Sequence, residues 1–347
     1  MKKKYYSILF ISLFSILLLA GCSGNKSEKK QDSKSETVTP DVPAIIGSET
    51  TSFLKDLEEN GNYVKSREFP SLIKASIVNE EMGKKNLIID LRPASSFSEG
   101  HIKGAVNKPF KELPQFFETG IKPFEYDKII MVCNDGQVSS YATCLLRLKG
   151  YGNVYAMRWG MSSWNKKYAG DGWLQGVSGK YETRLDTSVS EMPPVTAMPE
   201  LKTGLATGKE IGEARFKKLF DEGTDSILIT AEKVFNNPGK YFIINLERKD
   251  KYEDGHIPGA VRYKPESTLG FTNSMATIPF DKTIVVYCGT GHNSGFATAY
   301  LRLFGYDAKT LKYGNNGFMH DKMVKQRTAL SWLPFTLADV NNFAVVR

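Results

Sequence analysis

The sequence predicts an α/β protein made of two tandem copies of one domain, each a parallel sheet flanked by helices on both faces. The first observation behind this prediction is a repeat: the chain matches itself when shifted by 155 residues, without a gap from Ile88 to Tyr151. For example, Gly100-His101-Ile102 falls on Gly255-His256-Ile257. The second observation is that short apolar runs alternate with helical stretches in each copy, which is typical of a parallel sheet covered by helices.

The expected elements occur in the same order in both copies. Three pairs of short apolar runs are typical of buried strands: 86–91 and 241–246, 128–132 and 283–287, and 153–157 and 309–312. A helix is predicted at 139–149 and at 294–304, where a serine starts it and a glycine follows it. Two further helical stretches, 52–59 and 214–221, are expected to be peripheral additions to the two copies.

The chain of 347 residues is long enough for two domains. The predicted segments are a signal peptide at 1–21, a flexible tether at 22–50, domains at 51–185 and 209–347, and a linker at 186–208. The start of the tether is rich in Ser, Lys and Glu, and the linker contains several prolines, so both are expected to be extended.

The N-terminus has the pattern of a secretory signal, because three lysines precede an apolar run at 8–20. The run ends in Leu19-Ala20-Gly21-Cys22, which resembles the bacterial lipobox. The resemblance implies cleavage before Cys22, attachment of fatty acyl chains to it, and anchoring on the extracytoplasmic face of the cell membrane. The alternatives are an ordinary signal peptide and an uncleaved anchor.

Charge and cysteine spacing argue against several classes of function. The net charge of +8 falls to +5 without the three lysines of the signal peptide, and no dense Lys/Arg block is present, so a nucleic-acid partner is not supported. No Cys-x-x-Cys pair and no cluster of metal ligands is visible, so neither a metal nor another cofactor is expected. Cys144 is predicted to be a core residue, whereas Arg147 and Arg302 are predicted to lie on a solvated helix face.

The candidate chemistry lies at Cys133 and Cys288, each of which follows a predicted strand and precedes a loop and a helix. Ligands of parallel sheets bind at the carboxyl ends of strands, and loop amides at a helix N-terminus favour negative charge. We therefore expect a lowered thiol pKa and a loop that holds a persulfide anion. The predicted substrate-binding residues are Asn134, Asp135, Gly136, Gln137, Val138 and Ser139 in the first loop, and Gly289, Thr290, Gly291, His292, Asn293 and Ser294 in the second.

Both copies resemble the rhodanese family of sulfurtransferases in its tandem two-domain form. The resemblance rests on Asp90-Leu91-Arg92, Phe97 and Gly100-His101-Ile102-Lys103-Gly104-Ala105 in the first copy, and on Tyr252 and Gly255-His256-Ile257-Pro258-Gly259-Ala260 in the second. It implies transfer of sulfane sulfur from a small donor such as thiosulfate, through a cysteine persulfide, to a thiophilic acceptor such as a thiol or cyanide. No protein partner is identified from these residues.

The loops depart from the family pattern Cys-x-x-Gly-x-Arg-Ser. Val138 and Asn293 stand where the family often has arginine, and Glu247 stands where the first copy has Arg92. These departures weaken the expectation of efficient thiosulfate use at either site. Related phosphatases need an arginine in the seventh position of the loop, where this chain has serine, so phosphoryl transfer is not expected.

Cys288 is the preferred nucleophile of the two. Its loop has two glycines and His292 is expected to supply positive charge, whereas Asp135 would oppose a thiolate at Cys133. Two functions remain open at this point. One is an anchored extracytoplasmic sulfurtransferase, and the other is a noncatalytic binding or sulfur-sensing lipoprotein in which the cysteines are merely retained.

Overall fold

The computed structural model describes residues 45–263, 270–326 and 332–347. The predicted signal peptide, the candidate lipidation site Cys22 and most of the predicted tether lie outside the described residues. Among the helices that are described, none is both long and apolar enough to cross a membrane.

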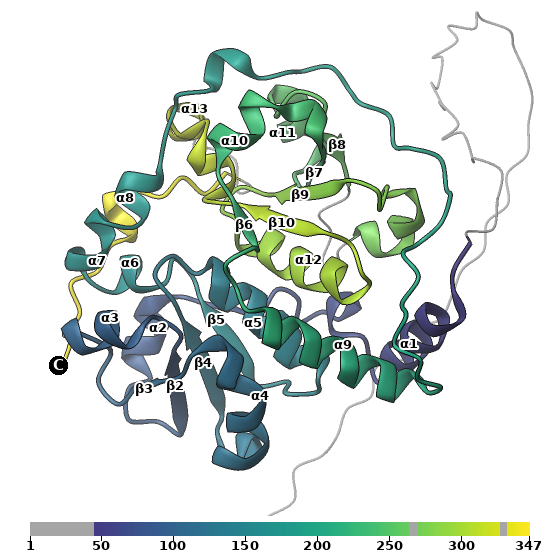
Figure 1. Ribbon diagram of the computed structural model, residues 1–347. Helices are drawn as coiled ribbons and strands as arrows, with labels where there is room; N and C mark the ends of the chain where they lie inside the picture. Colours follow the sequence, from purple (N-terminus) through teal and green to yellow (C-terminus); the bar gives the residue numbers. More distant parts are fainter. Residues whose placement is uncertain (1–44, 264–269, 327–331) are drawn as a thin grey trace, which may run out of the picture. The chain divides into compact units, whose positions relative to one another are not determined.

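Each copy contains one five-stranded sheet in which all paired strands are parallel (Figure 1). The first sheet has the order β1-β5-β4-β2-β3, and the second has the equivalent order β6-β10-β9-β7-β8. The strands of the first sheet are β1 (Leu72–Ile73), β2 (Asn86–Asp90), β3 (Val106–Asn107), β4 (Lys128–Val132) and β5 (Val154–Met157). Those of the second are β6 (Leu228–Ile229), β7 (Tyr241–Asn245), β8 (Val261–Arg262), β9 (Thr283–Tyr287) and β10 (Ala308–Leu311). The predicted α/β fold is confirmed.

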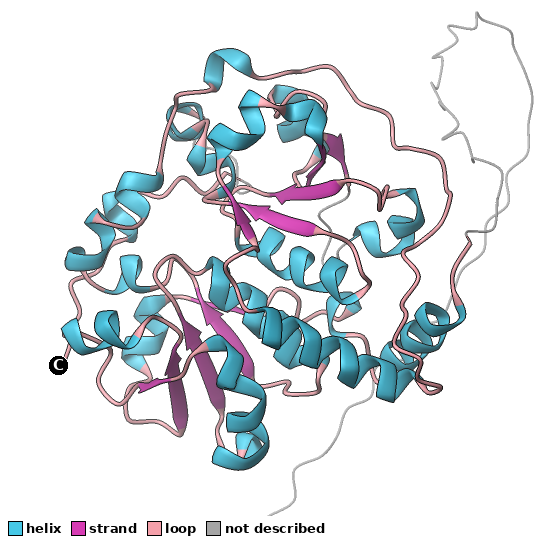
Figure 2. Cartoon of the chain, in the orientation of Figure 1, coloured by secondary structure: helices cyan, strands magenta, loops and turns pink. Residues whose placement is uncertain are grey.

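Helices cover both faces of each sheet (Figure 2). Those of the first copy are α2 (Ala75–Glu80), α3 (Ala94–Glu99), α4 (Leu113–Gln115), α5 (Gln137–Leu148), α6 (Met161–Trp164), α7 (Lys166–Gly170) and α8 (Trp173–Gly176). Those of the second are α10 (Ala231–Asn236), α11 (Lys249–Asp254), α12 (His292–Leu303) and α13 (His320–Lys325). Because helices lie on both faces, the central strands β4 and β9 read as continuous apolar runs rather than as alternating ones.

The two copies share one hydrophobic core. Helices α5 and α12 pack against each other between the two sheets (Figure 1). A single cluster of buried side chains includes Leu145 of α5 and Phe296 of α12, together with Cys144, which confirms that this cysteine is a core residue. The described residues form one compact unit because the repeats bury this face against each other.

The helices α1 (Ser48–Glu59) and α9 (Gly208–Glu222) were expected at the periphery, and that expectation is wrong. They pack against each other, and Phe53 of α1 contacts Phe216 of α9 and Phe304 of the second copy, with ring centroids 6.3 and 5.1 Å apart. Phe220 of α9 contacts Phe110 of the first copy at 4.9 Å. Each helix therefore joins the shared core, because its aromatic side chains have partners far away in the sequence.

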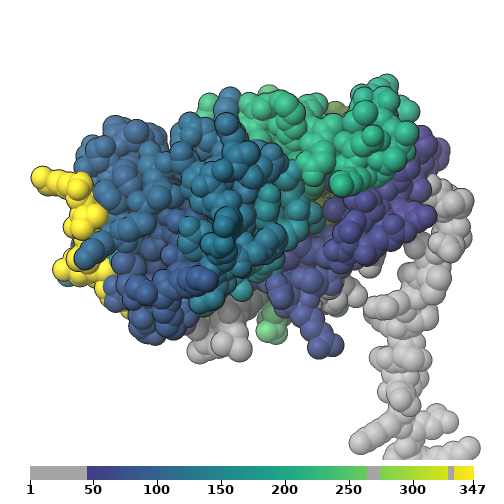
Figure 3. Space-filling view, turned by 90° about the horizontal axis from the view of Figure 1, so that it is seen from below, coloured from purple at the N-terminus to yellow at the C-terminus, as the bar shows by residue number. Residues whose placement is uncertain are grey.

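The segment that follows each copy packs on the other copy. His101 pairs in antiparallel fashion with Val346, and the equivalent His256 pairs with Asp186. Two N–H···O=C bonds of 2.9 Å make each pair. The C-terminal residues, yellow in Figure 3, accordingly lie against the first copy, in blue. The predicted boundaries of domains and linker stay predictions.

Arg147 and Arg302 are buried, so the expected solvated helix face is a wrong prediction. Arg147 forms an ion pair with Glu68 at 2.5 Å, and Arg302 forms one with Glu222 at 2.7 Å. Both arginines also donate a hydrogen bond to a backbone carbonyl of the following strand. The carboxylates that partner them lie 79 and 80 residues away in the sequence, where no local pattern reveals them.

Candidate active site

Each candidate cysteine comes directly after a central strand and lies near the start of a long helix. Cys133 follows β4 and Cys288 follows β9, and the helices α5 and α12 begin four residues later. The turn between them requires glycine, because Gly136 and Gly291 have φ values of 87° and 77°, in the left-handed region. This turn brings N–H groups at the start of the helix toward the cysteine.

The Cys133 sulfur is surrounded by hydrogen-bonding groups. The N–H groups of Gly136 and Ser139 point at Sγ from 3.1 and 3.4 Å, and the Ser139 hydroxyl lies 3.5 Å from it. Asp135 is buried, and its Oδ1 lies 3.6 Å from the sulfur while accepting the N–H of Gln137 at 2.9 Å. The acid therefore faces the thiol rather than solvent.

The Cys288 loop has the same turn but no acid within it. The Cys288 sulfur lies 3.8 Å from the Ser294 hydroxyl, and Thr290 stands at the position that corresponds to Asp135. A buried acid outside the loop, Glu247, accepts a hydrogen bond from Asn315 at 3.3 Å. Burial raises the pKa of Glu247 to about 8, so its carboxyl group is mostly neutral at pH 7.

Burial raises the pKa of both thiols, contrary to the expectation from the loop pattern. The pKa of Cys133 rises to about 12, first through burial and second through the charge of Asp135. The pKa of Cys288 is raised by burial and, to a smaller extent, by Glu247. Loop N–H groups lower both pKa values, but the loss of water around the thiolate outweighs them.

The fifth residue of the second loop contacts the first copy rather than Cys288. His292 is buried, its Nε2 accepts the N–H of Trp159 at 3.0 Å, and its Nδ1–H donates to the Thr290 hydroxyl at 2.8 Å. Burial, followed by the charge of Arg158, lowers the pKa of His292 to about 3. The expectation that His292 supplies positive charge is therefore wrong, because this imidazole is neutral.

Gln137 makes the corresponding contact in the opposite direction. Its Oε1 accepts the N–H of Tyr313 at 2.9 Å, and its Nε2 donates to the carbonyl of Leu311 at 3.2 Å. Trp159 and Tyr313 occupy equivalent places after the last strand of each sheet, and both have a φ of 64°. Gln137 and His292 thus hold the two copies in register.

The remaining predicted loop residues differ in how exposed they are and in whether they lie beside a sulfur atom. Asn134 is exposed and Val138 is partly exposed, while Ser139 and Ser294 lie buried beside the sulfur atoms. Four residues of the second loop line a cavity of about 270 Å³: Cys288, Gly289, Thr290 and Asn293. The cavity gives the second loop a space in which a small molecule can meet the sulfur.

Both copies form this cavity. Leu246, Glu247 and Arg248 line it from the second copy, and Leu72 and Arg158 line it from the first. The sequence predicts that Arg158 follows the last strand of the first sheet, but nothing local indicates that this sheet edge faces Cys288. Sequence reasoning therefore missed Arg158 as a residue of the site.

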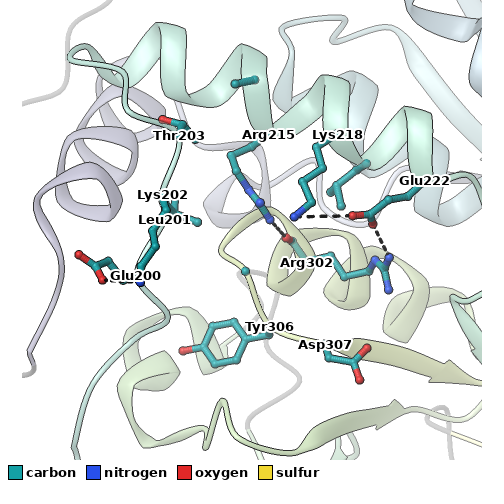
Figure 4. A pocket seen from close by; sticks show the side chains of 13 residues that line it. Glu200, Leu201, Lys202, Thr203, Arg215, Lys218, Glu222, Arg302, Tyr306 and Asp307 are labelled. Atoms are coloured by element: carbon teal, nitrogen blue, oxygen red, sulfur yellow. Dashed lines mark hydrogen bonds and ion pairs between the residues drawn. The ribbon is translucent and has the colours of Figure 1, made fainter.

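A second, larger cavity of about 580 Å³ lies at the opposite end of α12 (Figure 4). Its arginines already have partners, since Arg302 pairs with Glu222 and Arg215 donates to the carbonyls of Arg302 and Leu303. We assign no chemistry to it. In the described part of the chain, no group of three His, Cys, Asp or Glu side chains is placed to hold a metal ion.

Comparison with known protein families identifies the two repeats. The family model for the rhodanese-like domain matches residues 74–167 and 230–321, which together make up more than half of the chain. The chain belongs to the rhodanese family. Membership supports a sulfurtransferase-type function, and the matched ranges contain both cysteine loops of this rhodanese-family chain.

Individual relatives match more distantly. The tRNA uridine(34) hydroxylase of Prochlorococcus marinus (strain MIT 9312) is 30% identical over 135 residues, which are 37% of this chain and 38% of the relative. The chain therefore matches well under half the length of that protein. A rhodanese-related protein from Thermoplasma volcanium is 23% identical, with a TM-score of 0.25 over 27% of this chain and 89% of the other. A thiosulfate sulfurtransferase from Pseudomonas aeruginosa is 14% identical, with a TM-score of 0.28 over 78% of this chain and 48% of the other.

Proposed function

We propose that the chain is a membrane-anchored extracytoplasmic sulfurtransferase that carries sulfane sulfur as a persulfide on Cys288. The observation that carries the proposal is the cavity beside Cys288, which a loop with a helix N-terminus borders on one side. The membership in the rhodanese family supports the same class of reaction. A sulfur donor and an acceptor thiol, or cyanide, are the small-molecule partners.

The transfer takes two steps that balance without an external oxidant or reductant. The Cys288 thiol first loses its proton to solvent, and its sulfur then attacks the outer sulfur of the donor. A new S–S bond forms at Cys288 while the donor's bond to that sulfur breaks, and the leaving group keeps the electron pair; with thiosulfate it is sulfite. An acceptor thiolate then attacks the outer sulfur and releases Cys288 as a thiolate.

Cys288 is favoured over Cys133 because of what lies beside each sulfur. The buried carboxyl group of Asp135, 3.6 Å from the Cys133 sulfur, opposes both a thiolate and an incoming anion. Thr290 at the equivalent place carries no charge. Loop N–H groups and the Ser294 hydroxyl are the groups that would hold the persulfide of Cys288.

The test is a mass measurement on the full-length chain in detergent after incubation with thiosulfate or with inorganic polysulfide. We expect a gain of one sulfur atom, about 32 Da, on the peptide that contains Cys288, and its loss when a thiol is added. Cys288→Ser should abolish the gain, while Cys133→Ser, the matched control in the other loop, should retain it. Transfer that survives in the double variant would overturn the proposal.

A noncatalytic binding or sulfur-sensing role is the second candidate. The raised pKa of both thiols and the lack of an arginine in either loop favour it. In that case neither thiosulfate nor polysulfide adds sulfur to Cys288, although iodoacetamide still alkylates the thiol.

The proposed membrane anchor rests on two sequence features: the amino-terminal signal pattern and the lipobox-like motif that ends at Cys22. Two acyl chains attached at Cys22 would be sufficient for stable attachment to the membrane. Metabolic labelling with a palmitate analogue should mark the wild-type chain and not Cys22→Ala. Label that persists in this variant would contradict the anchor.

A further inference from the structure

Arg158 of the first copy lines the cavity beside Cys288. It follows β5 directly, and its backbone is fixed on both sides. Its N–H donates to the carbonyl of Ile73 at 2.9 Å, and its carbonyl accepts the hydroxyl of Ser163 at 2.9 Å. The side chain therefore starts from a rigid point at the edge of the first sheet.

The residue after Arg158 is joined to the Cys288 loop itself. The N–H of Trp159 donates to Nε2 of His292, the first residue of α12, at 3.0 Å. The positive charge of Arg158 is also one cause of the low pKa of His292, which places that charge near the loop. The position of Arg158 relative to the loop is thus set by a direct hydrogen bond between the copies.

The guanidinium group of Arg158 is available to a ligand. Within residues 45–263, 270–326 and 332–347, it forms neither a hydrogen bond nor an ion pair, whereas Arg248 of the same cavity is ion-paired with Asp250 at 3.1 Å. Burial lowers the pKa of Arg158 and the charge of Asp339 raises it, but an arginine remains protonated at neutral pH. The cavity thus contains a partly buried cation that no described residue hydrogen-bonds or ion-pairs.

The position equivalent to Arg158 in the second copy also carries a cation. Lys312 directly follows β10 as Arg158 directly follows β5, so it is the corresponding residue of the second copy. Burial raises the pKa of Asp135 in the first loop, and the charge of Lys312 offsets part of that rise. Each loop therefore faces a cation from the other copy. In the first loop the acid Asp135 lies beside the sulfur, whereas the second loop has the uncharged Thr290 at the equivalent place.

We propose that Arg158 supplies, from the first copy, the anion-binding charge that the Cys288 loop lacks, so that this site takes small sulfur donors that carry an oxyanion group. The inference rests on the proposed function for its substrate class. The planar fork of a guanidinium matches two oxygens of such a group, and the cavity of about 270 Å³ admits a molecule of that size. Each copy would thus be incomplete without the other.

The test compares alkylation of Cys288 by iodoacetate, an anion, and by iodoacetamide, its neutral analogue. Rates are measured on the full-length chain in detergent by mass spectrometry of the Cys288 peptide. We expect Arg158→Gln to lower the iodoacetate-to-iodoacetamide rate ratio by about threefold to tenfold, since one nearby charge is lost. Arg158→Lys should restore most of the ratio, because it keeps the charge.

Lys312→Gln is the matched control, and it should leave the ratio at Cys288 unchanged. Loading by thiosulfate should fall in Arg158→Gln by at least the factor seen in the alkylation ratio, because thiosulfate carries two negative charges and iodoacetate one. An unchanged ratio in Arg158→Gln would overturn the inference, as would an equal or larger effect of Arg248→Gln. If the wild-type chain accepts no sulfur at all, the proposed function fails while the alkylation ratio still decides the role of Arg158.

Discussion

At the scale of single residues, two buried acids set the difference between the two thiols. Asp135 lies against the Cys133 sulfur, within hydrogen-bonding distance of the thiol. Glu247 lines the cavity of Cys288, and its pKa of about 8 means that its charge appears only in mildly alkaline solution. The reactivity of Cys288 therefore depends on pH through two groups, the thiol itself and Glu247.

Glu247→Gln tests this coupling. Below pH 8 the wild-type carboxyl group is mostly protonated, so the variant and the wild type should alkylate with iodoacetamide at equal rates. Above pH 8 the wild-type carboxylate raises the pKa of Cys288, so less of the thiol is ionised and the variant should react faster, by about threefold to tenfold. Glu253→Gln, an exposed acid on α11, is the control and should match the wild type. Equal rates at pH 9 would show that Glu247 does not act on Cys288.

At the scale of elements, α1 and α9 form a helix pair whose close approach depends on a glycine. A Cβ atom at Gly212 of α9 would lie 2.7 Å from Cε2 of Phe53 on α1. Phe53 in turn packs against Phe304 at the end of α12. A side chain at position 212 would therefore push apart three helices that belong to the shared core.

Gly212→Ala should lower the free energy of unfolding by about 1–2 kcal/mol, because an overpacking cost of about 2–3 kcal/mol outweighs the better helix propensity of alanine, which is worth about 1 kcal/mol. Urea unfolding followed by circular dichroism measures the change. Lys217→Ala, at an exposed position of the same helix, should change the stability by less than about 0.5 kcal/mol. Phe53→Leu should relieve part of the loss in the double variant, and additive losses would argue against the contact.

At the scale of the whole molecule, the two copies are joined by reciprocal contacts. Gln137 and His292 each accept an N–H from the segment that follows the last strand of the other copy, namely from Tyr313 and Trp159. The segment after the first copy pairs with His256 of the second, and the segment after the second copy pairs with His101 of the first. Near the C-terminus, the carbonyl of Ala344 also accepts a hydrogen bond from the indole of Trp164 at 2.9 Å. The segment that follows each copy in the sequence therefore packs against the opposite copy.

Truncation after Asn341 tests this arrangement. Loss of the pairing with His101 and of the Trp164 hydrogen bond should lower the unfolding free energy by about 1–3 kcal/mol. Hydrogen exchange should accelerate at residues 100–102 and 164–168. The equivalent turn at His256 serves as an internal control, because Asp186 still pairs with it. Exchange that stays slow at His101 would mean that the C-terminal segment does not stabilise the first copy.

The sequence alone determined the fold class, the duplication and the two cysteine loops. These features are encoded locally, since buried strands need apolar runs, the loop turns need glycines, and a duplication preserves its register. The lowered thiol pKa was predicted wrongly because it requires the balance between loop amides and burial, and burial is known only after packing.

The tertiary structure alone decided which groups face each sulfur. His292 points to Trp159 and is neutral, Arg147 and Arg302 find carboxylates far along the chain, and Arg158 reaches the cavity of the other copy. These contacts depend on how the two folded copies pack against each other. Many apolar side chains determine that packing together, so no single position in the sequence indicates it. The sequence repeat therefore predicts the fold of each copy, but it does not reveal that Arg158 of the first copy lines the cavity beside the Cys288 loop of the second copy.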